Sequence, residues 1–316
     1  MIPERKFLIS PGPHLWKGLS VSKIMYRVVI ALMFPTGAAI YFFGYRALSV
    51  IGVSVAAAVV TEYVCKRLRN RAFVMDGSAV VTGILLGLVL PPTIPLWMVA
   101  IGSIFAIGIV KEAFGGLGHN IFNPALGGRA FMTACFSVPM TTWVLPMGFG
   151  VDAVTSATPL SGSSVWQPGD PSVYQALFLG NTAGSLGETS ALFILIGGIF
   201  LLARGIINWR IPAVYIGMVA LMAVALGQDP LFYILAGGLM LGAFFMATDY
   251  VTSPLTNKGK IIFSVALGVL TVMIRHFGGM PEGVCFSILF MNALTPAIDR
   301  YTKTRPYGLQ RVKSEG

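Results

Sequence analysis

Residues 152–159 form a polar, turn-forming run, Asp-Ala-Val-Thr-Ser-Ala-Thr-Pro, inside a chain that is otherwise very apolar. Pro159 disfavours helix at the residue before it, so we expect Thr158 on an extended or turn segment with an accessible hydroxyl. A threonine hydroxyl is a poor nucleophile, and modifying it needs an agent that activates it or a very good leaving group. Residue chemistry alone therefore leaves two interpretations of Thr158, an unmodified loop residue and a modification site.

A second group of candidates consists of charged residues within or near apolar stretches, which are functional hypotheses by default. Asp76 and Asp249 each stand among Gly, Ser and Thr residues, which suits an oxygen-ligated cation or a proton relay. Arg129 suits a helix end, an acidic neighbour or a phosphate group. For Asp76, Asp249 and Arg129 the alternative is simple structural pairing. The charged residues of this group are Glu62, Asp76, Glu112, Arg129, Asp249 and Asp299.

Familiar catalytic and metal-binding patterns are missing from the sequence. It contains no Gly-x-Ser-x-Gly, no phosphate-binding Gly-x-x-x-x-Gly-Lys-Ser/Thr, and no histidines at metal-ligand spacing. Cys65, Cys135 and Cys285 are far apart and form no CxxC pair. The chain by itself therefore predicts neither a disulfide framework nor a zinc or iron–sulfur site.

Composition identifies the surroundings in which these residues must work. Of the 316 residues, 55% are hydrophobic and 11% are charged, and the mean hydropathy is +0.79. Soluble domains carry about 25% charged residues, so we predict an all-α, polytopic membrane protein. The net charge of +10 then sets topology and is no sign of nucleic-acid binding.

The apolar stretches predict ten transmembrane helices, since a span needs about 20 mainly apolar residues. Prolines mark several of their boundaries. The predicted spans are 24–43, 47–65, 73–90, 94–113, 121–140, 189–206, 211–227, 230–248, 261–277 and 281–299.

Lysine and arginine predict the orientation of these spans. With the N-terminus in the cytoplasm, the inner segments hold nearly all of them, whereas residues 131–188 hold none. We therefore expect residues 141–188 to form one long extracytoplasmic loop between two five-helix halves, 24–140 and 189–299. A cytoplasmic N-terminal segment (1–23) and a cytoplasmic tail (300–316) complete the chain.

An odd number of spans in each half would make the halves inverted repeats, whose interface commonly forms a transport site. Phe-Gly-Gly follows both the fourth and the ninth span, and an Asn and Pro cluster follows each, beginning at Asn123 and at Asn292. Gly83-xxx-Gly87 has a counterpart in Gly238-xxx-Gly242. Chance is the alternative in a chain with 37 glycines. The repeat adds Asn123 to the candidates for an ion path or a cofactor contact.

The polar run resembles Asp-x-x-Ser/Thr-Gly-Ala-Thr, the motif at which a flavin transferase links FMN through its phosphate to the last threonine. Asp152, Thr155, Ala157 and Thr158 are in register, and Ser156 stands where glycine is usual. Residues 10–14, 76–83 and 116–125 are also similar to one family. Over nearly its whole length the chain resembles the D subunits of the Rnf complex, the ion-translocating ferredoxin:NAD oxidoreductase.

The resemblance implies a subunit of the inner membrane that takes part in electron transfer between ferredoxin and NAD, coupled to Na+ or H+ translocation. It implies covalent FMN on Thr158, with Asp152, Thr155, Ser156 and Ala157 as the surrounding motif, and a second, noncovalent riboflavin. One such chain is catalytically incomplete. Iron–sulfur and NAD-binding subunits, a second flavin subunit, small membrane subunits and the flavin transferase are therefore implied as partners.

Three other interpretations remain. The B subunit of the sodium-pumping NADH:quinone reductase shares the core and the flavin motif, although it usually carries a longer N-terminal region. A passive channel or solute transporter would explain an inverted repeat by itself. A structural scaffold for redox partners would explain the apolar helices. Neither of the last two needs a flavin motif.

Overall fold

The computed structural model describes residues 20–146, 169–278 and 283–303. Within these ranges every regular element is helical, as the sequence predicts, and there is no β-strand. The π-helices η1 and η3 continue α4 and α11 without a break. The elements are α1 (Val21–Phe43), α2 (Tyr45–Leu68), α3 (Ser78–Leu88), α4 (Leu96–Ile104), η1 (Phe105–Glu112), α5 (Pro124–Cys135), α6 (Ser137–Thr141), α7 (Pro171–Leu179), α8 (Ala191–Ala203), α9 (Arg210–Ala225), α10 (Pro230–Leu235), α11 (Leu239–Leu241), η3 (Gly242–Met246), α12 (Asn257–Phe277) and α13 (Gly283–Thr302).

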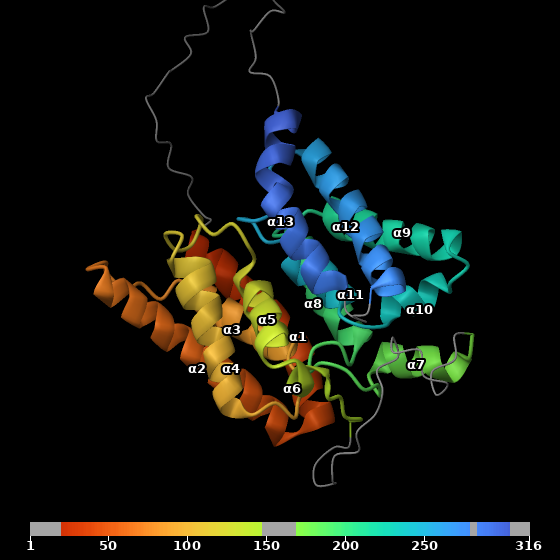
Figure 1. Cartoon of the computed structure of the whole chain (residues 1–316), viewed down its shortest axis with the longest axis horizontal. Coiled ribbons are helices and arrows are strands. Elements are labelled where there is room, and N and C mark those ends of the chain that lie inside the picture. Colours follow the sequence, from red (N-terminus) through yellow and green to blue (C-terminus); the bar gives the residue numbers. More distant parts are fainter. Residues whose placement is uncertain (1–19, 147–168, 279–282, 304–316) are drawn as a thin grey trace, which may run out of the picture.

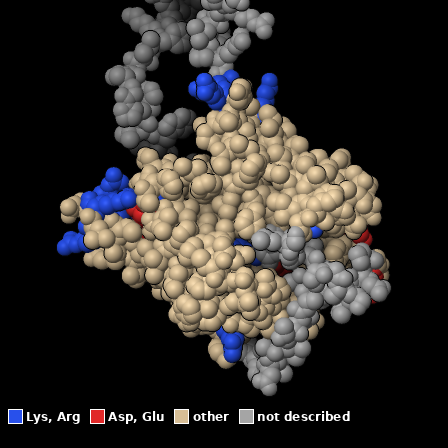
Figure 2. Space-filling view, in the orientation of Figure 1, with Lys and Arg blue, Asp and Glu red and all other residues tan. Residues whose placement is uncertain are grey.

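The exterior of the helices is that of a membrane protein. α1, α2 and α12 are long and apolar enough to cross a bilayer, and only about a third of each apolar window is buried inside the protein. The remaining apolar side chains face outward, where lipid would receive them more readily than water. Figure 2 shows a broad uncharged area, with Lys and Arg gathered mainly at the edges of this face.

Several helices begin with an Asx residue followed by proline. The Asn123 side chain accepts from two backbone N–H groups at the start of α5, and Pro124 follows. Asp170 with Pro171 begins α7 in the same manner, as does Asp229 with Pro230 in α10. The side chain satisfies backbone donors that the first turn leaves free, and proline has none to lose there. These short sequences therefore define where three elements start.

The elements from α1 to α6 gather on one side of the molecule and those from α8 to α13 on the other (Figure 1). In the first group, α2 packs against α3 and α4, and α5 packs against η1. In the second group, α12 packs against α9 and α13. The groups meet where α1 contacts α8 and where α5 contacts α13. One apolar core runs through both groups.

Some predicted spans are only partly helical. In the span 73–90 only α3 is helical, and its 11 residues would extend about 16 Å, roughly half of a bilayer's hydrocarbon thickness. The span 230–248 is interrupted between α10 and α11 at residues 236–238, where Gly237 has a φ of +72°. The predicted loop 141–188 contains the helix α7. Hydropathy cannot show these differences, because interrupted and continuous helices are equally apolar.

The carbonyls at the end of α3 accept hydrogen bonds from a segment that is distant in the sequence. The backbone N–H groups of Leu186 and Gly187 donate to the carbonyls of Leu90 and Leu88, at 3.1 and 2.6 Å. The last carbonyls of a helix have no partner within it. The non-helical segment before α8 therefore satisfies the backbone of a half-length helix in the other group.

The two glycine pairs make different contacts. Gly83 and Gly87 face α2 so closely that a Cβ on Gly83 would lie 2.6 Å from Val55 Cα. Gly238, by contrast, lies against the Glu188 side chain, and Gly242 lies against Val284 of α13. The first pair is therefore a helix-packing surface within one group, whereas the second lies at the interrupted helix.

Candidate functional site

The five residues predicted to form the flavin attachment motif, Asp152, Thr155, Ser156, Ala157 and Thr158, lie outside the described residues. The structure does describe the segment that comes after them in the chain, from Gly169 onward. α7 begins at Pro171, and Val173 and Leu177 on it pack against Phe232 of α10. The Tyr174 hydroxyl donates to the Asp229 carboxylate and accepts from the Gly169 N–H. The chain just after the motif is thus docked on α10.

Asp229 holds this contact through more than one interaction. Burial would raise the pKa of its carboxyl, but the hydrogen bonds from Tyr174 and from the backbone N–H groups of Phe232 and Leu231 outweigh burial and lower the pKa. The carboxylate therefore stays ionised at neutral pH. It caps α10 and joins that helix to α7 at the same time.

A cavity of about 70 Å³ lies between the two groups of helices. The first group contributes Ser78, Thr82, Lys111, Asn120 and Asn123 to its walls. The other group contributes the ends of α8 and η3 and the segment that follows η3. Apolar side chains from α1, including Met25 and Val28, and from α3 form most of the remaining lining. We call this the central cavity.

Asn123, which lines the central cavity, connects the two groups of helices. Asn123 caps α5, and its Nδ2 also donates to the carbonyl of Met246, 3.3 Å away in the other group. With its amide oriented to satisfy its neighbours, Asn292 accepts from the Asn123 N–H at 3.1 Å and donates to the Thr252 carbonyl at 3.3 Å. The two asparagines that the sequence matches across its halves are therefore in direct contact.

Asn120 reaches the cavity from a loop that needs glycine. Gly115, Gly116 and Gly118 have φ values of +126°, +95° and +93°, which residues with a side chain rarely adopt. The Asn120 Nδ2 donates to the Phe122 carbonyl at 3.0 Å. Its Oδ1 is buried and has no hydrogen-bond partner among the described residues. A buried carbonyl oxygen without a partner at a cavity wall is a candidate ligand for water or a cation.

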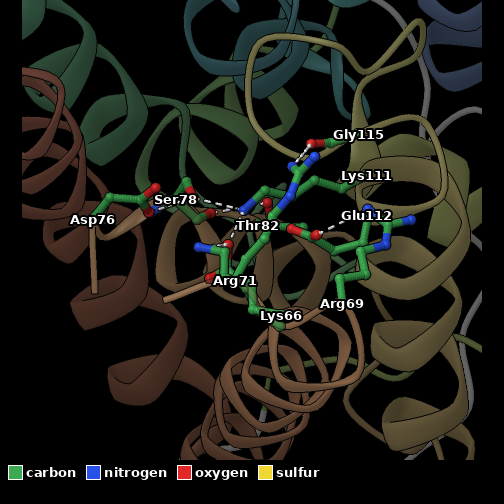
Figure 3. A network of polar contacts seen from close by, with 10 residues as sticks. Lys66, Arg69, Arg71, Asp76, Ser78, Thr82, Lys111, Glu112 and Gly115 are labelled. Carbon is green, nitrogen blue, oxygen red and sulfur yellow. Dashed lines mark hydrogen bonds and ion pairs between the residues drawn. The ribbon is translucent and has the colours of Figure 1, made fainter. Parts of the chain in front are cut away.

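Lys111 is the most buried charge in the cavity wall, with 1% of its surface exposed. Its ammonium donates to Glu62 Oε1 on α2 at 2.8 Å and to Ser78 Oγ at the start of α3 at 2.6 Å. Glu62 Oε1 also pairs with Lys66 at 3.1 Å. Figure 3 shows Lys111 at the centre of this network, with Ser78 on one side of it. We call Glu62, Lys66, Ser78 and Lys111 the lysine network.

Asp76 adjoins the lysine network without lining the cavity. Its Oδ1 accepts from the Ser78 N–H at 2.9 Å and from Ser78 Oγ at 2.5 Å (Figure 3). Because the same Ser78 hydroxyl accepts from Lys111, Asp76 is connected to the lysine network through that oxygen. Asp76 thus supports the start of α3, which is the structural role that the sequence left open.

Asp249 lies on the opposite wall of the central cavity, in the segment after η3. It accepts from Thr252 Oγ1 at 3.1 Å and makes no ion pair with the described residues. Burial raises the pKa of its carboxyl, and the hydrogen bonds from Thr252 and from the backbone N–H groups of Val251 and Tyr250, together with the charge of Lys111, offset this only in part. A proton or a cation at this carboxylate would therefore relieve an unbalanced charge.

Arg129 lies apart from the central cavity. Its guanidinium is 3.6 Å from Glu188 Oε1, and both side chains are almost fully buried. The pair lines a much smaller cavity of about 10 Å³, together with Gly238 at the interrupted helix and Cys285 on α13. Nearby, Arg275 donates to the Tyr233 and Ala236 carbonyls at the end of α10, at 2.6 and 3.1 Å. Of the expected partners for Arg129, the acidic neighbour is the one observed.

The structure thus brings Asn123 and Asp249 to one cavity, places Asp76 beside it, and separates Arg129 from all three. Sequence reasoning missed Lys111, which appeared only as a positive charge at the end of a span. Its signal was the neighbouring Glu112, because a Lys-Glu pair at the end of an apolar run can point inward. It also missed Glu188 and Asn120. No three His, Cys, Asp or Glu residues cluster as a metal site in the described ranges.

Comparison with known proteins gives the family. The chain is 48% identical to the D subunit of the proton-translocating ferredoxin:NAD(+) oxidoreductase complex of Clostridium ljungdahlii, covering 98% of both proteins. It is 46% identical to the D subunit of the Na(+)-translocating ferredoxin:NAD(+) oxidoreductase complex of Acetobacterium woodii, covering 99% of this chain and 98% of that protein. The D subunit of the ion-translocating oxidoreductase complex of Stutzerimonas stutzeri is 41% identical, covering 92% of both. A family model matches residues 8–308, and the chain belongs to the NQR2, RnfD, RnfE family.

Proposed function

We propose that this chain is the D-type membrane subunit of an ion-translocating ferredoxin:NAD oxidoreductase. The observation that carries the proposal is end-to-end similarity to two D subunits of complexes with that name, at 48% and 46% identity. One of these relatives is named for protons and the other for Na+. Similarity therefore supports coupled electron transfer and ion translocation, with either ion. The other subunits of such a complex would supply the iron–sulfur and NAD-binding sites.

We further propose that Thr158 carries FMN, linked through its phosphate by a flavin transferase. Support comes from the motif of Asp152, Thr155, Ala157 and Thr158, together with the family. When bound, FMN supplies electron-carrying chemistry that amino acids lack. The described residues nearest in sequence are those of α7, and docking of α7 on α10 would hold one end of the attachment segment in place.

Fluorescence of the denatured chain under ultraviolet light tests this proposal. In a host that possesses the transferase, the band should fluoresce after denaturing electrophoresis, because a covalent flavin remains attached. Thr158→Val should make it dark, while Thr142→Val, which removes a threonine outside the motif, serves as the matched comparison. A dark band from the unmodified chain, or a fluorescent Thr158→Val band, would refute attachment at this residue.

For the membrane topology we propose ten membrane-crossing segments in two inverted halves, with both termini in the cytoplasm. Helix contacts support a two-fold relation. α2 packs against α4 as α9 packs against α12, and α5 packs against η1 as α13 packs against α12. The first segments, α1 and α8, contact one another, and so do the last, α5 and α13. The concentration of lysine and arginine in the segments predicted to be cytoplasmic supports this orientation of the termini.

The central cavity is our proposal for the ion's binding place on the cytoplasmic side. Asp249 offers a carboxylate, Asn120 an unpartnered carbonyl oxygen, and Asn123 and Ser78 lie in the same walls. Oxygen donors of this kind suit Na+ and water alike. Both halves form the walls, so that a change in their arrangement would change the site, as coupling requires.

Riboflavin is the second cofactor that the resemblance implies. The mixed polar and apolar lining of the central cavity suits a flavin ring. However, a cavity of about 150 Å³ is what accommodates one benzene ring, and the central cavity is about 70 Å³. The residues as arranged do not fit a three-ring group there, and we assign it no role.

A further inference from the structure

Glu62 is a buried carboxylate that pairs with two lysines, Lys66 on its own helix and Lys111 on η1. Lys111 Nζ lies 2.8 Å from Glu62 Oε1, and Lys66 Nζ lies 3.1 Å from the same oxygen. Buried ion pairs normally need one partner for each charge, because an uncompensated charge in a low dielectric is very unfavourable. Lys66, whose side chain is 17% exposed, would by itself keep Glu62 compensated. Lys111 is thus free to leave without stranding the carboxylate.

Across the central cavity, the Asp249 carboxylate differs from Glu62, because no cation in the described part of the chain pairs with it. It makes no ion pair with the described residues, and Lys111 is the only Lys or Arg among them that lines the same cavity. The lysine side chain has a flexible four-carbon stem and a compact charge that can be re-aimed. Two cations in one small cavity of low dielectric repel each other strongly. Lys111 and a bound ion would therefore compete for one carboxylate.

We propose that Lys111 is a tethered cation that exchanges with the transported ion at Asp249. In the arrangement observed, Lys111 is held by Glu62 and Ser78, and Asp249 is open to an ion. In the other arrangement, Lys111 pairs with Asp249 and the ion has left, while Lys66 neutralises Glu62. Asp249 then always pairs with one cation, either the ion or Lys111, so the ion cannot remain bound through both arrangements. This inference rests on the proposed function of the chain.

The exchange makes Lys111 and Lys66 necessary for coupling but not for electron transfer. The complete complex, reconstituted in liposomes, would be assayed for 22Na+ uptake, proton uptake and electron transfer from ferredoxin to NAD. We expect Lys111→Met to lose ion uptake per electron while electron transfer continues. We expect its apparent affinity for the coupling ion to rise about fivefold or more, the smallest factor usual for coupled sites. Lys111→Arg keeps a cation and should retain part of the uptake.

Lys66→Met is the second, independent variant. Without Lys66, Lys111 cannot leave Glu62, so uptake per electron should fall here as well. A purely structural role for Lys111 predicts no such effect of Lys66. Lys258, which is exposed on α12 and outside the cavity, provides the matched control, and Lys258→Met should behave as the unmodified complex.

Each outcome decides a separate question. Normal uptake per electron in both Lys111→Met and Lys66→Met overturns the exchange and leaves the proposed function standing. If Lys111→Met fails to assemble, normal uptake in Lys66→Met alone overturns it. If the unmodified complex transfers electrons but moves neither ion, the proposed function fails and the exchange fails with it.

Discussion

At the scale of single residues, the interior is organised by shared charges. Glu62 binds two lysines, and Asp229 caps one helix while binding the tyrosine of another. In both cases one carboxylate lies where elements distant in the sequence converge. The effect of losing a residue therefore depends on whether its partners keep another partner.

This difference gives a prediction for the lysine network. Glu62→Gln leaves Lys111 buried without a carboxylate, and breaking a buried pair in this way should lower the free energy of unfolding by about 3–5 kcal/mol. Lys66→Met removes a partly exposed partner of the same carboxylate, and we expect a loss of only about 0–1 kcal/mol. Unfolding in detergent, followed by circular dichroism, measures both. Equal losses in the two variants would show that Lys111 does not depend on Glu62.

At the scale of elements, the main feature is the half-length helix. α3 is supported on one side by the close glycine contact with α2 and at its end by the segment before α8. Such a helix needs neighbours to complete its backbone bonding, because lipid offers no partners. Its position therefore depends on contacts that leave no extra room.

The substitution Gly83→Ala tests the close contact between α2 and α3. A Cβ at this position would lie 2.6 Å from Val55 Cα, so Gly83→Ala forces the helices apart and should destabilise by about 1–3 kcal/mol. Gly52 on α2 has open space around it, and Gly52→Ala should be neutral or slightly stabilising. Thermal unfolding of the two variants in the same detergent compares them directly. A Gly83→Ala protein as stable as the Gly52→Ala protein would contradict the close packing.

Element types were largely predictable from the sequence, but their interruptions were not. The span 230–248 is apolar throughout, and at its break the guanidinium of Arg275 binds the carbonyls at the end of α10. No local pattern connects residues that lie about 40 positions apart. The candidate site was also only partly predictable. Residue type identified Asp249 and Asn123 as candidates, whereas the cavity that both of them line depends on packing between the halves. Lys111 was hidden because its charge fitted the expected topology.

At the scale of the whole molecule, the free cysteines provide a test of how the first half is oriented in the membrane. Cys135 is exposed at the end of α5, Cys65 is partly exposed near the end of α2, and Cys285 is buried. In the proposed topology, α2 ends in the cytoplasm and α5 ends outside. The cysteines therefore mark one position on each face and one in the interior.

Labelling with a membrane-impermeant maleimide tests the topology. Variants that keep one cysteine each would be treated in right-side-out and in inside-out vesicles. We expect Cys135 to react only in the former, Cys65 only in the latter, and Cys285 in neither. Reaction of Cys65 and Cys135 from the same face would rule out the proposed orientation of the first half.

The interrupted helix also has a consequence for the order in which the chain can be made. α10 leaves the ribosome well before Arg275, which later binds its last carbonyls. Six residues are too few to enter a bilayer independently. We therefore expect α10 to reach its final position only after α12 has been translated. A chain stopped before α12 would lack Arg275, so the last carbonyls of α10 would be without the guanidinium that binds them.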